Sequence, residues 1–86
     1  MANSTVYDHI ALLNNFTYHR PVENQIERMK EIRKMARALA GRLIESCPPS
    51  RERALALTNL EQSVMWANAS IVRNEKESID EELDEA

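Results

Sequence analysis

The stretch LIESCPPSRERAL, residues 43–55, contains the turn that decides the fold. Cys47 precedes two prolines, and proline disfavours helical geometry in the residue before it and cannot donate the backbone hydrogen bond that a helix needs. Ser50 then stands where a helix N-cap belongs, and Glu52 places negative charge in the first turn after it. The stretch therefore predicts that one helix ends at about residue 46 and another begins at residue 51.

Apolar residues on both sides of this turn are spaced by three and four, which is the spacing of one helix face. Before the turn they are Ile26, Met29, Ile32, Ala36, Leu39 and Leu43, and after it they are Leu57, Leu60, Val64, Ala67 and Ile71. Two helices over residues 22–46 and 51–74, joined by so short a turn, predict a long antiparallel αα-hairpin.

A shorter helix is predicted upstream, because Val6, Ile10 and Leu13 share one face over residues 5–15. Residues 16–21 (FTYHRP) follow as a polar and aromatic connector. The chain has one glycine in 86 residues, which makes a sheet with several tight turns improbable. We therefore expect an all-α fold with a short N-terminal helix (1–15), a helical-hairpin domain (16–74) and a C-terminal tail (75–86).

Charge is distributed unevenly along the chain. The formal net charge is −3, but residues 75–86 contain seven acidic residues against one lysine, so we expect an acidic tail that is disordered or forms a frayed helix. Nine of the ten basic residues before the tail lie between Arg20 and Arg53. This distribution suits a small phosphate-bearing partner. The excess of basic over acidic residues before the tail is too small for a long nucleic-acid footprint, so we expect no DNA or RNA partner.

Cysteine and histidine usage gives no support to catalysis. Cys47 is the only cysteine, and His9 and His19 lie on different elements without a carboxylate at a telling spacing. We therefore expect no enzyme activity, no cofactor and no metal site. No stretch has the length of a membrane span and the first residues do not resemble a signal peptide, so we expect a cytosolic protein without a membrane partner.

A second apolar stripe on the later long helix points away from the hairpin seam, by which we mean the apolar faces that the two long helices turn toward each other. Exposed apolar stripes of this kind usually pack against another surface. It comprises Leu55, Met65, Trp66, Ala69 and Val72. We assign it to contacts between subunits of a homo-oligomer. The alternative is a monomer in which the short N-terminal helix folds back and covers the whole stripe.

Basic residues on the first long helix are candidates for phosphate binding. Four cations at positions i, i+3, i+4 and i+7 share one stripe: Lys30, Arg33, Lys34 and Arg37. Such a stripe could hold two phosphates. The alternative is a solvated face that Glu27 and Glu31 partly neutralise.

Two further candidates flank the hairpin. In the connector, Tyr18, His19 and Arg20 combine an aromatic platform with a fork-shaped cation, which suits a base and a phosphate, although Tyr18 could instead pack on the hairpin. At the end of the last helix, Arg73 and Asn74 suit either the negative helix terminus or a ligand phosphate.

Two segments carry a resemblance to a known family. The run CPPSRERALALTNLEQSVMWANASIVRN, residues 47–74, strongly resembles the second half of a phage helical-hairpin domain found in the anti-CBASS cyclic-oligonucleotide sponge and in a related anti-Thoeris sponge. The connector FTYHRP and the helix start VENQIERMKEIR resemble the anti-CBASS branch. Together the two segments span residues 16–74.

The resemblance implies a small all-helical protein without catalytic activity that assembles as a compact hexamer of interlocked dimers. It also implies a function in the cytoplasm of the bacterial host. There the family sequesters cyclic di- and trinucleotide messengers, such as cyclic GMP-AMP and cyclic triadenylate, so that CBASS effectors are never activated. Two other classes stay open: a structural or adaptor hairpin that binds a protein, and a small nucleic-acid-binding regulator.

The resemblance also assigns roles to residues. Tyr18 matches the connector tyrosine that stacks on a base, Lys30 or Arg33 matches the stacking cation of the first long helix, and Arg73 matches the arginine near the end of the second. The remaining candidates are of second rank: His19, Arg20, Lys34, Arg37 and Asn74.

Overall fold

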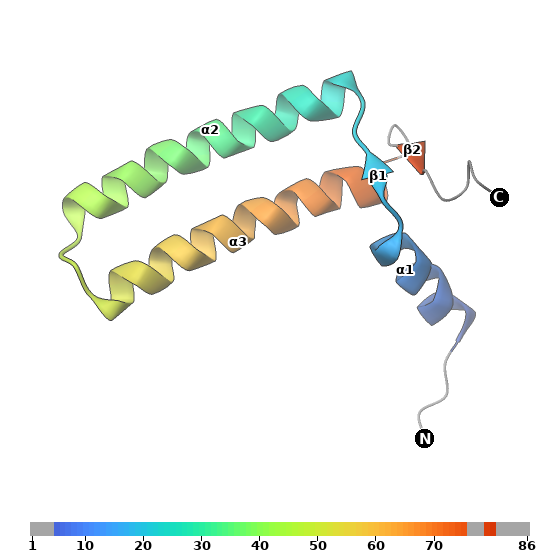
Figure 1. Ribbon diagram of the computed structural model, residues 1–86, viewed down its shortest axis with the longest axis horizontal. Helices are drawn as coiled ribbons and strands as arrows, with labels where there is room; N and C mark the ends of the chain where they lie inside the picture. The colour runs from blue at the N-terminus through green and yellow to red at the C-terminus, as the bar shows by residue number, and fades with distance from the viewer. Residues whose placement is uncertain (1–4, 76–78, 81–86) are drawn as a thin grey trace.

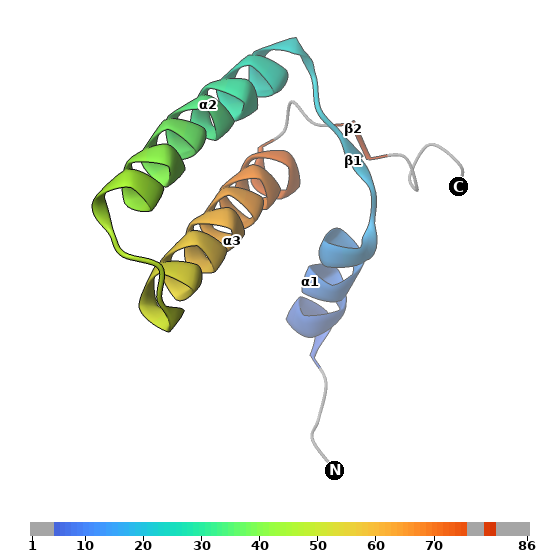
Figure 2. The same cartoon turned by 60° about the vertical axis from the view of Figure 1, so that its left-hand side comes forward.

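The computed structural model describes residues 5–75 and 79–80, which form three helices and one short pair of strands (Figure 1). In chain order the elements are α1 (Val6–Phe16), β1 (His19–Arg20), α2 (Glu23–Ser46), α3 (Arg51–Asn74) and β2 (Ile79–Asp80). The long helices α2 and α3 lie side by side and run in opposite directions. Helix α1 stands at the open end of this hairpin, near the last turn of α3, in both views (Figures 1 and 2).

The turn between the long helices has the predicted form. Helix α2 ends at Ser46, and the Ser50 side chain caps α3 by accepting a hydrogen bond of 3.1 Å from the Arg53 backbone amide. The Arg53 guanidinium reaches back and donates to the carbonyls of Ile44 and Cys47 at 3.3 and 3.2 Å. These bonds satisfy carbonyl groups that the end of α2 leaves without a helical partner.

Helix α1 is fixed at its start by a capping box. The Thr5 amide donates to the Asp8 carboxylate at 3.0 Å, and the Asp8 amide donates to the Thr5 hydroxyl at 3.1 Å. The helix continues to Phe16, one residue past its predicted end, and the Thr17 hydroxyl donates to the Leu13 carbonyl at 2.6 Å. Phe16 is therefore helical instead of part of the connector.

The open end of the hairpin is joined by side chains. Gln25 is fully buried, and its amide donates to the Ile71 carbonyl at 3.4 Å and to the Glu75 carboxylate at 3.1 Å, while its oxygen accepts from the Val22 amide at 3.2 Å. Arg28 forms an ion pair with Glu75 in which the two bonds are parallel, one of them 2.9 Å long. The bonds from Arg28 and then from Gln25 lower the pKa of Glu75 below its usual value.

The expectation of a disordered or frayed acidic tail does not hold for Glu75, Ile79 and Asp80. Glu75 is held by the contacts just described, and β2 pairs antiparallel with β1, placing His19 opposite Asp80 and Arg20 opposite Ile79. The fold is thus helical with one minimal strand pair, which an all-α expectation does not include. Tail residues 76–78 and 81–86 lie outside the described residues, as do residues 1–4 of the predicted N-terminal segment.

Among the described side chains, no apolar residue is buried, and only Thr17, His19 and Gln25 are. The radius of gyration is 17.2 Å, against the roughly 12 Å expected for a compact domain of this length. The predicted seam residues of α3 are all half-buried. On α2, however, Leu39 is 49 % exposed and Ala40 takes its place on the seam, because a straight helix of 3.6 residues per turn drifts away from a heptad stripe.

The second apolar stripe of α3 is not covered by α1. Met65 is 62 % and Trp66 is 68 % exposed, so the monomer in which α1 folds back over the whole stripe is not the structure of the chain. The apolar residues of α1 are themselves exposed, among them Val6, Ile10 and Phe16. A single copy of the chain therefore leaves two apolar helix faces open to solvent.

Candidate functional site

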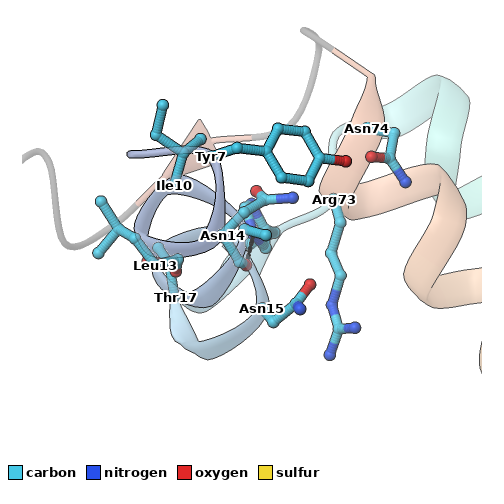
Figure 3. A pocket seen from close by; sticks show the side chains of 10 residues that line it. Tyr7, Ile10, Leu13, Asn14, Asn15, Thr17, Arg73 and Asn74 are labelled. Carbon is cyan, nitrogen blue, oxygen red and sulfur yellow. Dashed lines mark hydrogen bonds between the residues drawn. The ribbon is translucent and has the colours of Figure 1, made fainter. Parts of the chain in front are cut away.

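A pocket lies between α1 and the last turn of α3, and we call it the α1–α3 pocket (Figure 3). Its volume is about 600 Å³, which is within the range of small-molecule sites. Its polar and aromatic lining comes from three elements and the residue that follows α1: Tyr7, Asn14 and Asn15 of α1, Thr17 after it, His19 of β1, and Arg73 and Asn74 of α3.

The α3 side of this pocket supplies a cation and an amide. Arg73 is half-buried in the last helical turn, and the Asn74 side chain donates to the Ser70 carbonyl at 3.1 Å. A guanidinium offers paired donors to a phosphate. The structure thus brings together three of the predicted site residues, Arg73, Asn74 and His19, at one pocket.

His19 takes part in this pocket from a buried position. The residue is 7 % exposed, and its Nε2 lies 2.7 Å from the Asn14 carbonyl oxygen. That contact joins the connector to the last turn of α1 and fixes the angle at which α1 leaves the hairpin. The imidazole therefore supports the pocket wall, because most of its surface is covered by the chain itself.

A second candidate surface is a groove of about 460 Å³ along one side of the hairpin, which we call the hairpin groove. Arg33 and Arg37 of α2 line it opposite Glu61 and Asn68 of α3. Within the described part of the chain, the buried Asn68 Oδ1 has no hydrogen-bond partner. A buried acceptor is normally satisfied, so a donor from a ligand or another chain would suit this groove.

The four-cation stripe of α2 divides between two surfaces. Arg33 and Arg37 line the hairpin groove. Lys30 and Lys34 line a separate hollow formed by α2 alone, together with the acidic residues Glu27 and Glu31. Positions three apart are offset by about 60° around a helix, so the two edges of the stripe meet different surroundings. One protomer does not present all four cations to one ligand.

The connector presents its tyrosine to solvent. Tyr18 is 60 % exposed, which does not agree with the alternative in which it packs on the hairpin. It lines neither the α1–α3 pocket nor the hairpin groove. Arg20 follows in β1 and is also exposed. In one protomer Tyr18, Arg33 and Arg73 therefore belong to three different surfaces.

Sequence reasoning missed the α1 side of the α1–α3 pocket, including its tyrosine and its two asparagines, Tyr7, Asn14 and Asn15. A signal was present, since positions seven apart fall on the same helix face, which puts Asn14 on the face of Tyr7 two turns further along the helix. The sequence analysis instead used only the apolar residues of this helix, to predict that it forms. Across the described ranges, no three His, Cys, Asp or Glu side chains are grouped to hold a metal ion, and no helix there is long and apolar enough to cross a membrane.

Comparison with models of known protein families gives a match. The family model of the Acb2/Tad1 hairpin domain matches residues 8–72. The chain belongs to this family. Acb2/Tad1 hairpin proteins are the anti-CBASS and anti-Thoeris sponges. The resemblance to this family that residues 16–74 indicate is therefore confirmed.

The extent of the family match adds two facts. It begins inside α1, so most of the helix that the resemblance left out belongs to the Acb2/Tad1 hairpin domain. The family is one of phage anti-defence sponges, which sequester signals and are not known as enzymes. No curated protein and no solved structure matches the chain.

Proposed function

We propose that this chain binds cyclic di- and trinucleotide second messengers and sequesters them without cleavage, so that CBASS effectors in the bacterial host are not activated. The observation that carries the proposal is the match to the Acb2/Tad1 hairpin domain over residues 8–72. The arginines that line the α1–α3 pocket and the hairpin groove support the proposal, because a small anionic ligand needs only a few paired contacts.

We further propose that the working form is a homo-oligomer, a hexamer of interlocked dimers. The support is the absence of any buried apolar side chain among those described, together with the exposed Met65 and Trp66 on α3. Exposed apolar faces of this kind mark interaction surfaces. Light scattering of the purified protein tests this step, and the mass of a single chain would contradict it.

The ligand is proposed to lie where subunits meet. Tyr18, Arg33 and Arg73 occupy separate surfaces of one protomer, so a site that uses more than one of them draws on neighbouring copies. A symmetric cyclic dinucleotide at a two-fold axis would receive the same tyrosine and cations at each half. In this proposal Tyr18 stacks on a base, Arg33 or Lys30 stacks beside it, and Arg73 binds phosphate.

The second-rank residues take supporting roles. Arg20, Lys34 and Arg37 are exposed and can add phosphate contacts, and Asn74 can contact a base edge from the α1–α3 pocket. His19 is too buried for a direct contact of that kind, so we assign it to positioning α1.

Isothermal titration with 3',3'-cyclic GMP-AMP and with cyclic triadenylate tests the function, followed by chromatography of the released ligand. We expect tight binding and intact ligand. Cleaved ligand would identify an enzyme. Absence of heat with both ligands would favour the other candidate, a helical-hairpin adaptor whose exposed Met65 and Trp66 bind a protein partner.

The residue assignments are tested by Tyr18→Ala and Arg73→Ala. Each should weaken cyclic dinucleotide or trinucleotide binding by about 1–3 kcal/mol, through lost stacking in the first variant and lost charge-assisted hydrogen bonds in the second. Arg51→Ala is the matched control, since Arg51 is exposed at the opposite end of α3. Unchanged isotherms in both test variants would refute these two assignments.

A further inference from the structure

The α1–α3 pocket contains an aromatic residue that lies outside the family match. Tyr7 precedes the first matched residue by one position and lines the pocket from the first turn of α1. Its ring extends from α1 toward the end of α3 that carries Arg73 and Asn74 (Figure 3). The residue is 78 % exposed, so its ring faces are accessible within one protomer.

The helix that carries Tyr7 is fixed at both ends. At its start, the capping box between Thr5 and Asp8 holds the first turn through bonds of 3.0 and 3.1 Å. At its end, the contact of His19 Nε2 with the Asn14 carbonyl, 2.7 Å long, ties the last turn to the connector. Tyr7 therefore lies on a helix that is capped at its start and tied to the connector at its end, which favours a defined ligand contact over a loop residue that must order on binding.

The other walls of the pocket supply the groups that a nucleotide unit requires. Arg73 offers a guanidinium to a phosphate. The side-chain amides of Asn14, Asn15 and Asn74 each pair a donor with an acceptor, the arrangement that matches the edge of adenine. An aromatic face adds stacking, which tolerates any base. A volume of about 600 Å³ accommodates a base and its phosphate together.

We propose that Tyr7 stacks on the base of a bound adenine nucleotide unit whose phosphate is held by Arg73, and that it thereby sets the affinity of the α1–α3 pocket. The inference rests on the proposed function, because it takes the nucleotide unit to be part of a cyclic oligonucleotide. It extends the binding surface of the chain to a residue on the N-terminal side of the family domain.

Titration with cyclic triadenylate compares the wild type with Tyr7→Leu, Tyr7→Phe and a control, Phe16→Leu. Phe16 is equally exposed on the same helix but does not line the pocket. We expect Tyr7→Leu to raise the Kd by about tenfold or more, because stacking is lost. Tyr7→Phe keeps the ring and should stay within about threefold of the wild type, and Phe16→Leu should stay within about twofold.

Light scattering of each variant accompanies the titration, and the mass of the assembly should not change. A changed mass for Tyr7→Leu would assign Tyr7 to a subunit contact and overturn the inference. An unchanged Kd, or an equal loss in Phe16→Leu, would overturn it as well while leaving the proposed function intact. A wild type that binds neither cyclic triadenylate nor cyclic GMP-AMP would instead overturn the proposed function, and the inference with it.

Discussion

The two ends of the hairpin are held together by different means. At the closed end, α2 and α3 are joined by the turn around Pro48 and Pro49, and each contact links residues fewer than ten positions apart. At the open end, Gln25 and Arg28 reach partners 46 to 50 positions away in the sequence. The closed end is therefore organised by local backbone chemistry, and the open end by side-chain contacts that exist only once the helices have met.

The difference has a consequence for function, because the α1–α3 pocket, which Arg73 lines, lies at the open end. The Gln25–Glu75 contacts fix the end of α3 against the start of α2, directly after the residues that line the α1–α3 pocket. A change at the closed end should alter stability alone. A change at the open end should alter both stability and the position of Arg73.

The largest effect is expected for Gln25→Ala. The substitution removes three hydrogen bonds of a fully buried side chain and leaves the Val22 amide and the Ile71 carbonyl without these partners. We expect the free energy of unfolding to fall by about 2–3 kcal/mol. Urea denaturation at one fixed protein concentration measures it, since assembly couples stability to concentration.

Gln62→Ala is the matched control for this prediction. Gln62 is an exposed glutamine on α3, so its replacement should change the free energy of unfolding by no more than about 0.5 kcal/mol. Equal losses in the two variants would show that the buried contacts at the open end do not distinguish it from the helix surface.

An intermediate effect is expected for Ser50→Ala at the closed end. The hydroxyl that accepts from the Arg53 amide is lost, and an N-cap of this kind contributes about 1 kcal/mol. Thermal or urea unfolding measures the change, with the exposed, mid-helix Ser63→Ala as control. Cyclic nucleotide affinity should stay unchanged in both variants. A loss of affinity in Ser50→Ala would contradict the expectation that a change at the closed end alters stability alone.

The smallest effect is expected for Glu75→Gln, and it depends on pH. The pKa of Glu75 is lowered by Arg28 and Gln25 in the folded protein, so the ionised carboxylate favours the folded state. This contribution is fully present above the ordinary glutamate value of 4.5 and is lost as the pH falls through the lowered folded pKa. The difference between wild type and variant should therefore be constant near neutral pH and shrink on acidification below about pH 4.5.

Urea midpoints measured from neutral to acidic pH test this dependence. Glu45→Gln, an exposed glutamate in the last turn of α2, serves as the control and should not reproduce it. A wild-type advantage that grows as the pH falls would have the opposite sign and would exclude the Arg28–Glu75 pair as its source.

The long helices and their turn were predictable because their signals are short-range. Pro48, Pro49 and Ser50 act within one helical turn, and the predicted bounds differ from α2 and α3 by at most one residue. Leu39 was misplaced because its exposure depends on where the partner helix lies. Gln25 was missed because its partners Ile71 and Glu75 are distant in the sequence, so no local pattern around Gln25 indicates these contacts.

The candidate site was predictable in its residue types and not in its grouping. Arg73, Asn74 and His19 do meet at one pocket, but the position of α1 that creates the pocket depends on the His19–Asn14 contact. The division of the α2 cations between two surfaces depends on the rotation of α2 against α3. Tyr7 was not among the candidate residues, because its pocket does not exist in α1 alone.

The sequence by itself determined that the chain forms an antiparallel helical hairpin and belongs to the sponge family, since both conclusions rest on residue order within short segments. The tertiary structure alone decided which cations share a surface, that His19 is buried and that Tyr7 faces the end of α3. The physical reason is that helix propensity and capping act over a few residues, whereas a pocket requires side chains from distant segments to be fixed at one place.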